Sequence, residues 1–145
     1  MIVRRAAIIA EARTWLGTPY HHGASLKGAG CDCLGLVRGI YRAVLGAEPE
    51  RPPAYSASWL EASGEEAMLD AARRHLAGVP LATLRPGDVL VFRLRPGFAA
   101  KHAAILVAVD RMIHAQEGVS VSEVSLGGWW RRRVAGGFAF PGVVD

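Results

Sequence analysis

The chain has 145 residues, of which 51% are hydrophobic and 21% are charged, and its net charge at pH 7 is +4. This length predicts a single domain over residues 1–145, and this composition excludes an intrinsically disordered chain. The net positive charge favours binding to negatively charged molecules, such as an anionic polymer or an acidic protein partner. No helix-turn-helix, zinc-finger or RNA-binding signature points to nucleic acid.

The first expected element is a helix over Ala6–Leu16, which ends at Gly17. Arg4 and Arg5 precede its apolar residues and so imitate a secretion signal. The apolar run is only five residues long before Glu11, whereas a signal peptide needs ~7 to 15. We therefore expect no signal peptide. No run approaches the ~18 apolar residues of a membrane span.

A second helix is predicted to begin at Cys33. Residues 17–30 contain four glycines and are expected to form a loop. Apolar residues recur with a period of 3.6 over Leu34–Leu45, which is typical of a helix with one buried face. Asp32 is the expected N-cap of this helix, and Gly46 is expected to end it.

The second half of the chain is predicted to be mainly strands. A proline-rich surface loop is expected over residues 47–59, and Ser63 with Glu66 matches a capping box that opens a third helix over residues 65–78. Four β-rich segments follow, at residues 88–94, 102–109, 112–115 and 119–125. Helices followed by antiparallel strands predict an α+β fold. Trp129–Val134 is either a solvated basic edge or a docking surface.

The two cysteines, Cys31 and Cys33, are one residue apart. A disulfide between them would be badly strained. A zinc site that added His102 and His114 would have ligand gaps of one and eleven residues, unlike the usual pairs. A nucleophile or an inert core thiol remains. Cys33 fits the nucleophile better, because a helix N-terminus stabilises a thiolate and a distant histidine can supply the base. Cys31 is expected to be a buried spectator.

Four segments carry a family resemblance: "WLGTPYHHG", "GCDCLGLVRGIY", "LRPGDVLVF" and "KHAAILVAVDRMIHA". From about Trp15 to Ala115 the chain resembles the NlpC family of papain-like cell-wall cysteine peptidases. The most specific parts are the G-T-P-Y turn, the D-C-x-G-L helix start, the L-x-P-G-D lead-in and two histidines with eleven residues between them. The resemblance implies a papain-like fold, with N-terminal helices packed on a C-terminal antiparallel sheet and the nucleophile at the start of a central helix.

The resemblance also implies roles for single residues. By position, Cys33 is the nucleophile, His102 the general base and His114 the polar residue that orients it. Tyr20 corresponds to a tyrosine that helps the oxyanion site. Asp32 is expected to be mainly a helix cap. The more specific alternative is that its carboxylate contacts an amine of the substrate. No metal or cofactor is required.

The substrate that the resemblance implies is a peptidoglycan stem peptide, commonly cut between D-γ-glutamate and diaminopimelate. Leu34 stands where the family usually has serine. The resemblance therefore does not decide which bond of the stem peptide is cleaved. The short chain and the segment Gly46–Pro53 resemble the branch found in phage tails and gene-transfer-agent particles. That branch implies tail hub or tail-tip partners, synthesis in the cytoplasm and action in the periplasm of a target cell. A non-catalytic structural tail component is the alternative.

A geometric condition follows for the two histidines. A two-residue turn at Asp110–Arg111 would place His114 opposite Val107, on the other face of the sheet from His102. A site shared by the two histidines therefore predicts an odd-length turn or a bulge between their strands.

Overall fold

The computed structural model describes residues 2–50 and 66–145. In chain order the elements are β1 (Val3–Arg4), α1 (Arg5–Thr14), β2 (Ser25–Leu26), β3 (Gly30–Cys31), α2 (Cys33–Leu45), α4 (Ala67–His75), β4 (Ala77–Val79), the 3₁₀ helix η1 (Leu81–Thr83), β5 (Val89–Phe92), β6 (His102–Ala108), β7 (Arg111–Gln116), β8 (Val119–Ser125), α5 (Gly128–Arg131), β9 (Val134–Ala139) and β10 (Val143–Val144). None of the helices in these two ranges combines the length and the apolar character that crossing a bilayer requires.

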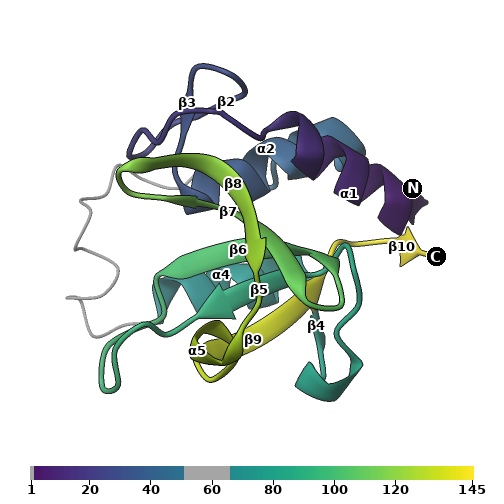
Figure 1. The fold of residues 1–145 in the computed structure, drawn as a ribbon. Coiled ribbons are helices and arrows are strands. Elements are labelled where there is room, and N and C mark those ends of the chain that lie inside the picture. The colour runs from purple at the N-terminus through teal and green to yellow at the C-terminus, as the bar shows by residue number, and fades with distance from the viewer. Residues whose placement is uncertain (1, 51–65) are drawn as a thin grey trace.

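The strands form a six-stranded antiparallel sheet in the order β4-β9-β5-β6-β7-β8. The four strand segments expected from the sequence correspond to β5, β6, β7 and β8. In Figure 1 the two ends of the chain lie together, because β1 pairs in parallel with β10. The predicted α+β class, with helices before the sheet, is confirmed.

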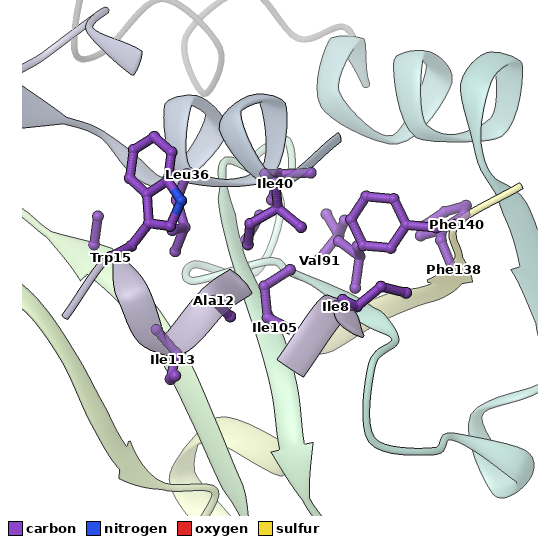
Figure 2. Packing of buried hydrophobic residues seen from close by; sticks show 14 of the residues in the cluster. Ile8, Ala12, Trp15, Leu36, Ile40, Val91, Ile105, Ile113, Phe138 and Phe140 are labelled. Atoms are coloured by element: carbon purple, nitrogen blue, oxygen red, sulfur yellow. The ribbon is translucent and has the colours of Figure 1, made fainter. Parts of the chain in front are cut away.

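The main core lies between the N-terminal helices and one face of the sheet. Figure 2 shows apolar side chains from both layers converging there. Those labelled are Ile8, Ala12, Trp15, Leu36, Ile40, Val91, Ile105, Ile113, Phe138 and Phe140. Side chains alternate along a strand, so the other face carries a separate apolar cluster. Its buried members are Leu90, Phe92, Ala104, Leu106, Met112 and Leu126.

The second helix begins where the sequence predicts. Asp32 Oδ1 accepts a hydrogen bond from the Gly35 N–H at 2.7 Å, which confirms Asp32 as the N-cap of α2. Gly46, with φ 98°, ends the helix. A Cβ at Gly35 would lie 1.8 Å from the carbonyl oxygen of Ala24. The glycine of the D-C-x-G-L motif therefore lets the preceding loop cross the first turn of α2.

The third helix is shorter than predicted. It spans Ala67–His75 instead of residues 65–78, and the chain turns into β4 at Ala77. Ser63 lies outside the described residues, as do residues 51–59 of the expected proline-rich loop. The Glu66 side chain does not cap the helix, because its carboxylate binds elsewhere. It accepts from the Arg93 guanidinium at 2.6 and 3.0 Å and from the Ala100 N–H at 3.1 Å. This links α4 to the loop that precedes β6.

The L-x-P-G-D lead-in holds the first helix against the sheet. Asp88 is 1% exposed, and its Oδ1 accepts from Arg5 Nη1 at 2.7 Å. Its Oδ2 accepts from the Arg85 N–H at 2.8 Å. The aspartate of this motif therefore joins the start of α1 to the start of β5.

We expect Asp88→Ala to lower the free energy of unfolding by about 3–5 kcal/mol, because the largely buried Arg5 guanidinium would keep only the more distant Asp145, at 3.9 Å, as a charge partner. The matched control is Asp70→Ala, since Asp70 pairs with Arg73 on the exposed surface of α4. That control is expected to change stability by less than ~0.5 kcal/mol. Urea denaturation measures both values, and equal losses would contradict the role given to Asp88.

Candidate active site

The two histidines predicted from the sequence lie on the same face of the sheet. The turn between β6 and β7 is Val109–Asp110, and the register shifts between Leu106, which pairs with Met112, and Ala108, which pairs with Arg111. Val107 is thus an extra residue in β6. From Met112, two residues along β7 reach His114, and four residues back from Leu106 reach His102, so both face the same way. The predicted bulge is confirmed.

The rings of these histidines touch. His102 Nε2 lies 2.8 Å from His114 Nδ1, and the rings meet edge to face with centroids 5.0 Å apart. The two residues are 7% and 2% exposed. Because Nε2 of His102 is engaged with His114, Nδ1 is the nitrogen left to exchange a proton with another group. This is the arrangement required of a base and the residue that orients it.

Cys33 is the first residue of α2 and is half-buried. Its Sγ lies 3.6 Å from the carbonyl oxygen of Lys101, the residue before His102. Within residues 2–50 and 66–145, the thiol donates to this carbonyl and forms no hydrogen bond with the His102 ring. The structure therefore brings the thiol to the backbone beside the histidine pair, and joins the two histidines to each other.

Burial shifts the pKa values of the Cys33 thiol and the His102 imidazole in the directions that favour their neutral forms. Burial, with a smaller contribution from Asp32, raises the pKa of the Cys33 thiol to about 12. Burial, with smaller contributions from His114 and Lys101, lowers the pKa of His102 to about 3. For the Cys33 thiol, desolvation therefore outweighs the field of the helix N-terminus, which by itself would stabilise a thiolate.

Tyr20 and Asp32 both lie beside the thiol. Tyr20 forms an isolated bridge with Cys31. Burial, followed by the charges of Asp32 and Cys33, raises the pKa of the Tyr20 hydroxyl to about 12, so this hydroxyl is a neutral hydrogen-bond donor at pH 7. Asp32 Oδ1 caps α2, and Oδ2 accepts from the Gly23 N–H at 2.8 Å. Both carboxylate oxygens thus hold backbone groups, as expected of a helix cap.

Cys31 has a different environment from Cys33. It is 0% exposed and belongs to the main core, and burial raises the pKa of its thiol to about 11. Cys31 is therefore buried as expected, and its role as a spectator stays a prediction. In the parts of the chain that the structure describes, no three His, Cys, Asp or Glu side chains are grouped so that they could hold a metal ion.

Two features of the site were not predicted. The first is the aromatic pair Phe92 and Trp130, which packs on the histidines. The second is an apolar cavity of about 290 Å³ between α2, α4 and the sheet, whose lining includes Leu34 and Ala103. These two residues directly follow Cys33 and His102 in the chain, so the cavity lies next to the starts of α2 and β6. Leu34 makes its wall apolar at the position where the family usually has serine.

Comparisons with known proteins identify relatives of this chain in sequence and in fold. The chain is 30% identical over 131 residues to a gamma-DL-glutamyl hydrolase of Bacillus subtilis (strain 168), a match that covers 89% of this chain and 28% of that protein. The NlpC/p60 domain of the peptidoglycan hydrolase SagA superposes with a TM-score of 0.67 at 25% identity, covering 94% of this chain and 98% of that one. An NlpC/P60 family protein from Bacillus cereus ATCC 10987 superposes with a TM-score of 0.69 at 22% identity, covering 94% and 40%.

The match to the family itself covers most of the chain. Residues 17–137 fit the NlpC/P60 family, a range that contains Tyr20, Asp32, Cys33, His102 and His114. The resemblance and the papain-like fold expected from the sequence motifs are thereby confirmed. The chain belongs to the NlpC/P60 family.

Proposed function

We propose that the protein is a cysteine endopeptidase that hydrolyses peptidoglycan stem peptides at the D-γ-glutamyl–diaminopimelate bond. Family membership places the chain among the cell-wall cysteine hydrolases. The observation that carries the proposal is the His102–His114 hydrogen bond of 2.8 Å beside a cysteine at the start of α2. The bond specificity is supported by the relative named a gamma-DL-glutamyl hydrolase.

In the proposed mechanism, the thiol of Cys33 leaves the Lys101 carbonyl and passes its proton to Nδ1 of His102. The thiolate attacks the carbonyl carbon of the scissile amide, and the oxygen of the tetrahedral intermediate becomes negative. The backbone N–H of Cys33 and the Tyr20 hydroxyl are the donors proposed for this oxygen. His102 protonates the departing amine, and a water that His102 deprotonates then hydrolyses the acyl-enzyme.

The histidine pair explains how a neutral base is kept ready. His114 accepts from Nε2 of His102, which fixes the tautomer that leaves Nδ1 unprotonated. Burial lowers the pKa values of both histidines, so neither ring is charged at neutral pH before reaction. A neutral His102 can accept the thiol proton as the substrate binds and water is displaced.

The test is the digestion of purified diaminopimelate-containing peptidoglycan, with mass spectrometry of the fragments. Cleavage at the proposed bond frees the amino group of diaminopimelate and leaves fragments that end in glutamate. Fragments with other new ends would assign a different bond. If the wild-type protein released none, the hydrolase proposal would fail, and the non-catalytic structural role would be favoured.

A finer proposal concerns where the enzyme acts. Gly46–Pro53 resembles the corresponding segment of phage-tail and gene-transfer-agent relatives, although residues 51–53 lie outside the described part of the chain. On this basis we propose a tail-associated peptidase that reaches the periplasm of a target cell. Fractionation of particles with an antibody against the chain tests this, and a protein absent from purified particles would refute it.

A further inference from the structure

The short helix α5 covers the histidine pair from the side opposite the N-terminal helices. Trp130 stacks on the His102 ring, with centroids 5.4 Å apart and an interplanar angle of 28°. The same indole meets His114 edge to face at 5.2 Å and Phe92 at 5.1 Å. Trp130 therefore contacts both histidines and the aromatic residue that packs on His102 from β5.

Trp130 is held in this position by its neighbour Arg131. Arg131 Nε donates to the carbonyl of Leu126 at 2.9 Å, and Nη2 donates to the carbonyl of Val109 at 2.9 Å. Val109 lies in the turn that joins β6 to β7, the two strands that carry His102 and His114. The arginine thus ties α5 to the hairpin whose histidines Trp130 covers.

We propose that Trp130 is a positioning residue for His102, whose indole fixes the plane of the imidazole and keeps water from the histidine pair. The role rests on the proposed function, since it acts through the proposed base. With the ring plane fixed, Nε2 of His102 stays on His114, and Nδ1 stays available for the thiol. A histidine without this cover would rotate about its χ2 bond, and both rings would gain contact with water.

The charged and titratable groups around His102 are few in the described structure. His114 faces it from β7, Lys101 precedes it in the chain, and Cys33 lies beside its backbone from α2. The element β5 contributes the uncharged Phe92, and α5 contributes the uncharged Trp130.

The main cause that lowers the pKa of His102 is burial, and Trp130 supplies part of that cover. Removing the indole should therefore raise this pKa toward the ordinary value of ~6.5. A protonated His102 cannot accept the thiol proton, so the activity of such a variant should fall at a higher pH than that of the wild type.

The chain offers a matched control in the adjacent tryptophan. Trp129 is 49% exposed, stacks under the Arg133 guanidinium at 3.8 Å and meets the edge of Trp130. The test compares Trp130→Ala, Trp130→Phe and Trp129→Ala in the full chain. We measure kcat and KM on stem peptides from pH 4 to 9. Histidine titrations by NMR, assigned with His102→Gln, follow the same variants without substrate.

For Trp130→Ala we expect kcat at neutral pH to fall by ~100-fold with KM changed much less, because the base is misplaced while the substrate still binds. The acid limb of its activity profile and the titration of His102 should both move to higher pH. Trp130→Phe should recover most of the activity, and Trp129→Ala should stay within about threefold of the wild type.

An unchanged His102 titration in Trp130→Ala would overturn the proposal, and so would an equal effect of Trp129→Ala. If Trp130→Ala does not fold, as judged by circular dichroism, Trp130→Leu and Trp130→Phe carry the same comparison. If the wild type cleaves no peptidoglycan, the proposed function fails. The NMR titration still decides whether Trp130 shields and orients His102.

Discussion

Cys33→Ala is expected to lower the rate of stem-peptide hydrolysis by ~10⁴-fold or more, to the background of the assay, because the attacking atom is removed. Cys31→Ala is expected to stay within a few fold of the wild-type rate. The two cysteines flank Asp32, but Cys33 contacts the Lys101 carbonyl beside His102, whereas Cys31 pairs with Ser25 in a two-stranded sheet. Release of soluble fragments from purified peptidoglycan measures both rates.

The controls separate a lost nucleophile from a damaged fold. Cys33→Ser keeps the size of the side chain and a donor for the Lys101 carbonyl, so it should unfold at the wild-type temperature and still be inactive. Cys31→Ala removes a fully buried sulfur and should lower stability by about 1 kcal/mol. Full activity in Cys33→Ala, or a loss confined to Cys31→Ala, would exclude Cys33 as the nucleophile.

The second large effect is expected at the histidine pair, where we predict how the losses in kcat of three variants rank. His102→Gln should lose ~10² to 10⁴-fold in kcat, the usual contribution of a general base. His114→Asn should lose less than His114→Leu, because an amide oxygen can still accept from Nε2 of His102. Leucine would leave that buried donor without a partner, at ~1–3 kcal/mol or ~10 to 100-fold. Steady-state kinetics at pH 7 measures the three rates.

A histidine that does not contact the pair gives the baseline for this series. His75 lies at the end of α4 in the lining of the cavity, where its Nε2 is 2.7 Å from the carboxylate of Glu50. His75→Asn should leave kcat unchanged within twofold, and any effect should fall on KM. If His114→Asn and His114→Leu were equally active, the hydrogen bond between the two histidines would have no part in the reaction.

The start of the central helix could be predicted because its signals are local. Asp32 caps the helix through a backbone group three residues away, and Gly46 ends it. The strands β5 to β8 have apolar or alternating residues and follow turn residues, so their pattern also lies within short segments.

The strand β9 could not be predicted because its residues do not form a pattern typical of a strand. It begins after three arginines and contains Gly136 and Gly137, which disfavour a strand. A Cβ at Gly137 would lie 2.5 Å from the Leu84 side chain. The glycine is therefore explained by a residue more than fifty positions earlier in the chain. The two-residue pairing of β1 with β10 is likewise too short to leave a periodic pattern.

The site was predicted only in part, because some of its features depend on contacts between residues far apart in the chain. Cys33, His102 and His114 were assigned from the family resemblance of their motifs, and their roles remain predictions until variants are measured. The cover of the histidines by Trp130 depends on tertiary contacts, so the sequence showed only aromatic and basic residues there. The raised pKa of the thiol could not be predicted either, because it depends on how deeply Cys33 is buried.

The extra residue in β6 has a consequence for how relatives of this protein are classified. Val107 is the residue where β6 and β7 lose their regular pairing. A relative that kept the same turn but paired this residue regularly, without the bulge, would keep the same sheet, the same cysteine and the same histidines. It would pair position 114 with position 105, so that its second histidine pointed away from the first. Loss of activity in this family can therefore arise from the loss of one bulge. An alignment scored only on its cysteine and histidines would count such a pseudoenzyme as active.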